Sequence, residues 1–123
     1  MKKVSALVVV VLAGALLALP ALGTAAATKP TSVIKVSALA SGLKFNTKVL
    51  YATAGKDKLV FTNLSTLHHN VRLEIGETEF GGTKTIGKGT TTATVTLKKG
   101  KYNFYCSVPG HEDAGMHGTL IVS

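Results

Sequence analysis

From residue 28 onward, apolar and polar residues alternate in short runs that glycine-containing turn signals separate. A period of two is typical of half-buried β-strands, whereas an amphipathic helix would repeat its apolar residues every 3.6 positions. No segment of useful length shows the helical period. The runs that predict strands are 33–38, 43–46, 58–63, 70–75, 91–97, 101–106 and 118–122. This part of the chain is therefore predicted to be all-β, a Greek-key β-sandwich of seven to eight strands.

The stretch 77–90 carries a weaker pattern. It holds Gly81-Gly82, Gly87 and Gly89 among threonines and lysines. Such a composition fits either an edge strand or a long crossover of the Greek-key type, and the sequence leaves both open.

The first 27 residues differ in composition from the rest of the chain. A basic start, Met1-Lys2-Lys3, precedes an apolar run over 4–19, and the small residues Ala25-Ala26-Ala27 follow. This order is typical of a secretory signal peptide, so we expect a signal peptide over 1–27 with cleavage near Ala27 and one folded domain over 28–123. An uncleaved anchor is the alternative, but the run is shorter than the roughly 20 residues of a spanning helix. We expect an exported protein, in the periplasm or at the outer face of the cytoplasmic membrane.

The chain is basic, with 14 Lys and Arg, 6 Asp and Glu and a formal net charge of +8. Loss of Lys2 and Lys3 with the leader leaves 12 basic against 6 acidic residues, a formal charge of +6. Acidic partners are therefore expected. The lysines are scattered, only one arginine is present, and the aromatic residues do not interleave with them, so no nucleic acid is expected as a partner.

Strand parity separates two adjacent histidines. Alternate residues of a strand share a face, so 71, 73 and 75 are predicted to point to the core. Extending this parity backward places His69 inside and sends His68 and Asn70 to the opposite face. The same argument applied to 101–106 puts Cys106 on an inward row with Tyr102 and Phe104.

Cys106 is the only cysteine, so no internal disulfide can form, and an unpaired thiol in an exported chain needs another explanation. Four residues separate Cys106 from His111, and four more separate His111 from Met116. Together with His69, this loop offers one thiolate, two imidazoles and one thioether. Soft sulfur combined with imidazole suits copper, although zinc in a Cys-His-His site stays open at this point.

The residues Leu67-His68-His69-Asn70-Val71, Tyr105 to His111 and Gly115-Met116 together resemble the cupredoxins, the type 1 blue copper proteins of the plastocyanin and azurin type. The loop spacing is most similar to that of auracyanins and rusticyanins. The resemblance implies that His69, Cys106, His111 and Met116 are the metal ligands. It also implies a link between Asn70 and Ser107 that holds the ligands in place.

The same resemblance implies a function and its partners. We expect one copper ion that cycles between Cu(II) and Cu(I), an electron carrier rather than an enzyme, a monomer, and redox proteins as partners. A membrane is expected only as a docking surface, or as the site of a retained leader. A periplasmic copper chaperone or storage protein is the alternative function. A copper enzyme would need the histidines of a further metal centre, and this chain has only four His.

Overall fold

The computed structural model describes residues 28–123, and these residues form strands, turns and connecting loops. The predicted signal peptide over 1–27 lies outside the described residues. Within the described part, no helix is long and apolar enough to cross a membrane. The eight strands are β1 (Val33–Ala38), β2 (Val49–Ala52), β3 (Gly55–Asn63), β4 (Arg72–Ile75), β5 (Thr78–Gly82), β6 (Gly89–Leu97), β7 (Gly100–Tyr105) and β8 (His117–Val122).

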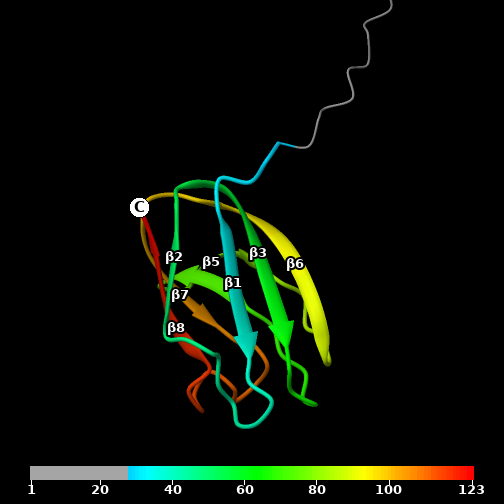
Figure 1. The fold of residues 1–123 in the computed structure, drawn as a ribbon. Coiled ribbons are helices and arrows are strands. Elements are labelled where there is room, and N and C mark those ends of the chain that lie inside the picture. The colour runs from blue at the N-terminus through cyan, green and yellow to red at the C-terminus, as the bar shows by residue number, and fades with distance from the viewer. Residues whose placement is uncertain (1–27) are drawn as a thin grey trace, which may run out of the picture.

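The strands form two sheets that face each other across one core (Figure 1). The three-stranded sheet has the order β1-β3-β6, and the five-stranded sheet has the order β2-β8-β7-β4-β5. β1 pairs with β3 and β2 with β8 in parallel, while the remaining pairs are antiparallel. The prediction of an all-β sandwich of seven to eight strands is confirmed.

Alternation explains why these segments become strands. In β1 every second side chain is buried, and β3 and β8 follow the same rule. The apolar faces of both sheets meet, which removes their side chains from water and supplies most of the stabilisation. The largest fully buried apolar side chains in this core are Phe61, Phe104, Ile34, Leu59, Leu73, Met116 and Leu120.

Two predicted strands differ from the structure. The segment 43–46 is not a strand, because only Phe45 makes a bridge, to Ala38. The strand predicted over 70–75 begins at Arg72, and the two residues before it belong to a loop. Conversely, β2 was not predicted, and β5 was only one of two alternatives for the stretch 77–90. In β2 the outward residues Val49 and Tyr51 are apolar as well, and Tyr51 is 71% exposed, so the period of two is hidden.

The stretch 77–90, for which the sequence left an edge strand or a long crossover open, contains both. It begins with the edge strand β5, and 83–88 then cross from β5 in one sheet to β6 in the other. Gly82 starts this crossing with a φ of +147°, and a Cβ added there would lie 2.2 Å from the carbonyl oxygen of Val71. A glycine is therefore required for the crossing to approach the chain beside His69 this closely.

Candidate metal centre

His69 lies in the connection between β3 and β4, and its side chain is fully buried. Its N–H donates to the carbonyl of Ile86 at 3.0 Å, and its own carbonyl accepts from the N–H of Ile86 at 2.9 Å. The side-chain amide of Asn63 donates to the same Ile86 carbonyl at 3.0 Å. The backbone of His69 is thus fixed from both sides. The parity prediction is confirmed for the two histidines, since His69 is buried whereas His68 is exposed. It was wrong for Ile75, which was predicted to point to the core but lies at the end of β4 and is 46% exposed.

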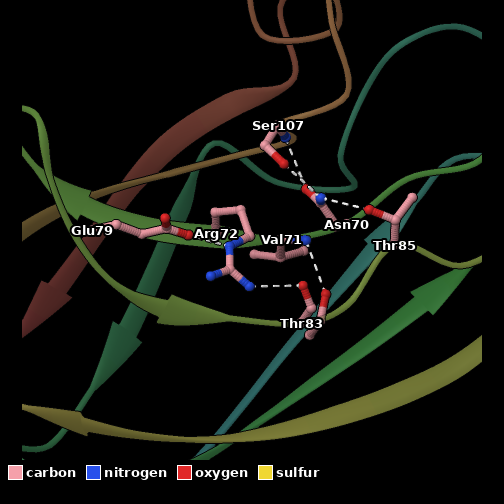
Figure 2. A network of polar contacts seen from close by, with 7 residues as sticks. All are labelled: Asn70, Val71, Arg72, Glu79, Thr83, Thr85 and Ser107. Carbon is pink, nitrogen blue, oxygen red and sulfur yellow. Dashed lines mark hydrogen bonds and ion pairs between the residues drawn. The ribbon is translucent and has the colours of Figure 1, made fainter.

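The residues that follow His69 are tied to the crossing segment (Figure 2). The N–H of Val71 donates to Thr83 Oγ1 at 3.0 Å, and the Asn70 amide donates to Thr85 Oγ1 at 2.9 Å. Asn70 was predicted on the face opposite His69, yet it is only 4% exposed. It is buried because Thr85 and Ser107 cover it, an arrangement between distant segments that strand parity cannot anticipate.

Asn70 also reaches the residue after Cys106. Its Oδ1 accepts from the Ser107 N–H at 2.8 Å, and its Nδ2 donates to Ser107 Oγ at 2.7 Å (Figure 2). The predicted link between Asn70 and Ser107 is confirmed. It connects the His69 segment directly to the Cys106 segment, so the two cannot shift independently.

Cys106 follows the last residue of β7, and it is fully buried on the same inward row as Tyr102 and Phe104. Its N–H donates to the carbonyl of Met116 at 3.0 Å. The N–H of Met116 in turn donates to the carbonyl of His111 at 3.1 Å. The loop from Cys106 to Met116 is therefore closed on itself by backbone hydrogen bonds among the very residues that carry the predicted donors.

Three donor atoms meet at this point. His69 Nδ1 lies 3.1 Å from His111 Nδ1, and Cys106 Sγ lies 3.8 Å from the first and 3.6 Å from the second. For one tetrahedral ion with bonds of about 2.0 Å to nitrogen and 2.3 Å to sulfur, the two nitrogens would lie about 3.3 Å apart and each nitrogen would lie about 3.5 Å from the sulfur. The observed spacings are close to these values, so one metal ion fits the three donors.

Met116 is fully buried and is held through its backbone by both Cys106 and His111. The ammonium group of Lys48, the residue before β2, donates to the carbonyls of Gly115 and His117, which flank Met116 on either side. Sequence reasoning missed Lys48 and the threonines of the crossing segment. They come from segments far from the site along the chain, and no local pattern marks them.

Burial also sets the charge state of His69. Desolvation lowers the pKa of its imidazole below the ordinary value of 6.5, and the nearby His111 and His68 lower it further. The ring is therefore neutral near pH 7, as a metal ligand must be. His69 Nε2 is buried without a hydrogen-bond partner among the described residues.

Residues 32–123 match a family described as copper binding proteins, plastocyanin/azurin family. The chain belongs to this family. Its members are the cupredoxins, and copper is accordingly the metal that fits the Cys-His-His donor set found here. The possibility of a zinc site, left open by the donors alone, is not favoured by the family.

Solved cupredoxin structures share the fold of this chain. Auracyanin B matches with a TM-score of 0.72 and 24% identity, over 78% of this chain and 91% of that chain. A reduced auracyanin from Roseiflexus castenholzii matches with a TM-score of 0.69 and 22% identity, over 78% and 99%. Rusticyanin from Thiobacillus ferrooxidans matches with a TM-score of 0.64 and 20% identity, over 77% and 79%. No curated protein sequence matches the chain.

Several carboxylates lie beside the loop from Cys106 to Met116, which is called the metal loop from here on. Glu112 belongs to the loop, and the Asn103 amide donates to both Glu74 and Glu112, at 2.9 and 3.4 Å. Burial raises the pKa of the Tyr105 phenol, and the charges of Glu74, Glu79 and Glu112 raise it further. Glu79 is paired with Arg72, so Glu74 and Glu112 are the carboxylates that make the surface around Tyr105 locally acidic, although the chain as a whole is basic.

Proposed function

We propose that His69, Cys106, His111 and Met116 bind one copper ion and that the protein carries single electrons between redox proteins. The convergence of two imidazole nitrogens and one thiolate sulfur within 4.8 Å supports this assignment most strongly. When bound, copper supplies the Cu(II)/Cu(I) couple, which a His₂Cys site with a weak thioether ligand suits.

The protein's part in this function is to keep the donors still. Backbone hydrogen bonds hold the segments of His69, Cys106 and Met116, and the Asn70 side chain joins two of these segments. A donor set that the fold fixes in advance changes little when the charge of the site changes, so little reorganisation opposes electron passage. With four donors, no position is reserved for a substrate, and we therefore propose a carrier rather than an enzyme.

His111 is the donor through which we propose that electrons enter and leave. It is half-buried, whereas His69, Cys106 and Met116 are fully buried. The metal loop and the β3–β4 connection lie at the same end of the sandwich (Figure 1). In that connection Leu64 is 46% and Leu67 is 51% exposed. Exposed apolar side chains at this end support brief, weak docking of a redox partner.

The local charge near the metal loop indicates which charge a docking partner should carry. The net charge of the chain predicts acidic partners, but Glu74 and Glu112 lie near Tyr105, directly before Cys106, while the nearby Glu79 is paired with Arg72. A partner that docks on this side of the metal loop is therefore proposed to carry positive charge, because complementary charges steer encounter. We also propose that residues 1–27 direct export and are removed, and that the carrier works as a monomer in the periplasm or at the outer face of the cytoplasmic membrane.

The adjacent histidines supply a matched test. His69→Ala should abolish stoichiometric copper binding, whereas His68→Ala should leave it intact, because only His69 faces Cys106. Voltammetry of the copper-loaded protein should show a reversible one-electron wave over repeated cycles, with copper retained. Loss of copper on each reduction would instead support a chaperone or storage protein and would contradict electron transfer.

A further inference from the structure

The outer surface of the three-stranded sheet carries exposed lysines and threonines. We call it the Lys/Thr face and define it by the outward residues Lys35, Lys56, Lys58, Thr92, Thr94 and Thr96. The strand register places Lys58 opposite Thr94 and Lys56 opposite Thr96. The side chains of these six residues are exposed. Cations and hydroxyl groups therefore share one surface formed by adjacent strands.

This face carries no exposed carboxylate. Of the six acidic residues in the chain, Asp57 lies in β3 but is fully buried on the inner side. Glu74, Glu77 and Glu79 belong to β4, β5 and the turn between them, and the other two acids are in the metal loop. The lysines of the face consequently have no acidic neighbours on their own sheet surface to neutralise them.

The face is hollowed at the end where β1 begins. A depression of about 340 Å³ is lined by Lys56, Asp57 and Lys58 of β3, by Thr92, Ala93 and Thr94 of β6, and by Thr28 and Pro30 of the segment before β1. The Asp57 carboxylate is fully buried and accepts hydrogen bonds from the N–H and the hydroxyl of Ser32, so the polar side chains exposed around the hollow are lysines and threonines. Ammonium and hydroxyl groups are donors that suit phosphate oxygens. The hollow is thus chemically suited to a phosphate group.

We propose that the Lys/Thr face docks on an anionic membrane surface, with phospholipid phosphates against Lys35, Lys56 and Lys58. The choice of a lipid surface rests on the side chains present. Protein interfaces are anchored by Tyr, Trp, Phe, Met and Arg, and none of these lies among the outward residues of the three strands. Lysine acts as a point charge and contributes about fivefold in affinity per residue near an anionic bilayer.

The position of the hollow leaves the metal loop accessible. The start of β1 lies at one end of the sandwich, and the loop from Cys106 to Met116 lies at the other (Figure 1). A protein that contacts a membrane through the hollow would hold the loop away from that contact. Docking on lipid and docking of a redox partner would therefore use different surfaces, and the first does not depend on the second.

The test uses the domain of residues 28–123, which contains all eight strands, from Val33 to Val122, and the whole buried core. Its binding to phosphatidylglycerol-containing vesicles is measured by co-sedimentation, with phosphatidylcholine vesicles as the neutral reference. Changing Lys35, Lys56 and Lys58 together to Gln should weaken binding about 100-fold. The matched control changes the exposed Lys44, Lys84 and Lys101 to Gln, removes the same net charge, and should weaken binding less than about fivefold.

A second variant keeps every lysine. Thr94→Glu places a carboxylate in the hollow and should weaken vesicle binding at least about fivefold, the effect of one charge, while the apolar inner face of β6 stays unchanged. Equal losses for the two lysine triples would overturn the proposal, because net charge alone would then explain binding. Strong displacement by soluble glycerol phosphate at matched ionic strength would also overturn it, in favour of a free-phosphate site. Colour and copper content of the domain report separately on the proposed carrier function.

Discussion

Asn70 binds Ser107 twice, with its Oδ1 accepting the Ser107 N–H at 2.8 Å and its Nδ2 donating to Ser107 Oγ at 2.7 Å. This pair joins the segment of His69 to the segment of Cys106. We predict that Asn70→Ala weakens copper affinity about 10- to 100-fold, because residues that hold metal ligands contribute on that scale. Competition with a copper chelator measures this. Asn46→Ala, which removes an exposed bond to the Ser37 N–H, is the control and should leave affinity unchanged.

Lys48 should hold the backbone around Met116. Its ammonium group donates to the carbonyls of Gly115 and His117, so Lys48→Met should free this segment while keeping the apolar stem. We expect at least about fivefold faster amide exchange at His117 in the metal-free protein, equivalent to one hydrogen bond of about 1 kcal/mol. In the copper protein the visible spectrum should change. Lys101→Met removes the same charge from β7, and an equal response there would count against a positioning role for Lys48.

Gly118 should tolerate no side chain. A Cβ at this position would lie 2.4 Å from Phe104 Cζ and 2.5 Å from the carbonyl oxygen of Lys48. Gly118→Ala is therefore expected to lower the free energy of unfolding by about 3 kcal/mol, as overpacked core positions do. Urea unfolding measures the loss. Gly87→Ala, whose nearest contact is His68 Nε2 at 3.6 Å, should change stability little, and similar losses for both variants would refute the packing argument.

The metal-free protein should lose stability in mild acid through His69. The pKa of this buried imidazole lies below 6.5, so between its lowered pKa and 6.5 the unfolded chain binds more protons than the folded one. The contribution is fully present above pH 6.5 and is lost as pH falls through the lowered pKa, by up to about 1.4 kcal/mol per pH unit. Urea unfolding at several pH values tests this. His69→Gln should flatten the slope, whereas the exposed His117→Gln should retain it.

The alternation of side chains along strands predicted the burial of two candidate metal ligands from only a few residues. Because side chains alternate, the inward rows of β4 and β7 were enough to choose His69 over His68 and to bury Cys106. The same rule failed at Asn70, which is outside β4 and is covered by a loop. It also failed for β2, where Val49 and Tyr51 are apolar but exposed, so composition no longer reports which face is buried.

Contacts between distant segments could not be predicted from the sequence. Lys48 is 67 residues away from Gly115 along the chain, and its carbonyl contacts follow only from the parallel pairing of β2 with β8. Ile86 forms two backbone hydrogen bonds with His69, because Gly82 lets the crossing segment lie close to the chain at Val71. Such contacts depend on how the sheets assemble, and local patterns carry no information about that. The link between Asn70 and Ser107 was predicted only through the resemblance to cupredoxins.

The visible absorption spectrum of the Cu(II)-loaded domain, recorded beside that of Cys106→Ala, tests thiolate ligation most directly. Cys106 Sγ lies 3.6 and 3.8 Å from the two imidazole nitrogens, so a bound Cu(II) ion should take the sulfur as a ligand. We predict an intense blue band at one copper per chain that is absent from the variant. A colourless wild-type protein, or a blue band that survives in Cys106→Ala, would contradict the account.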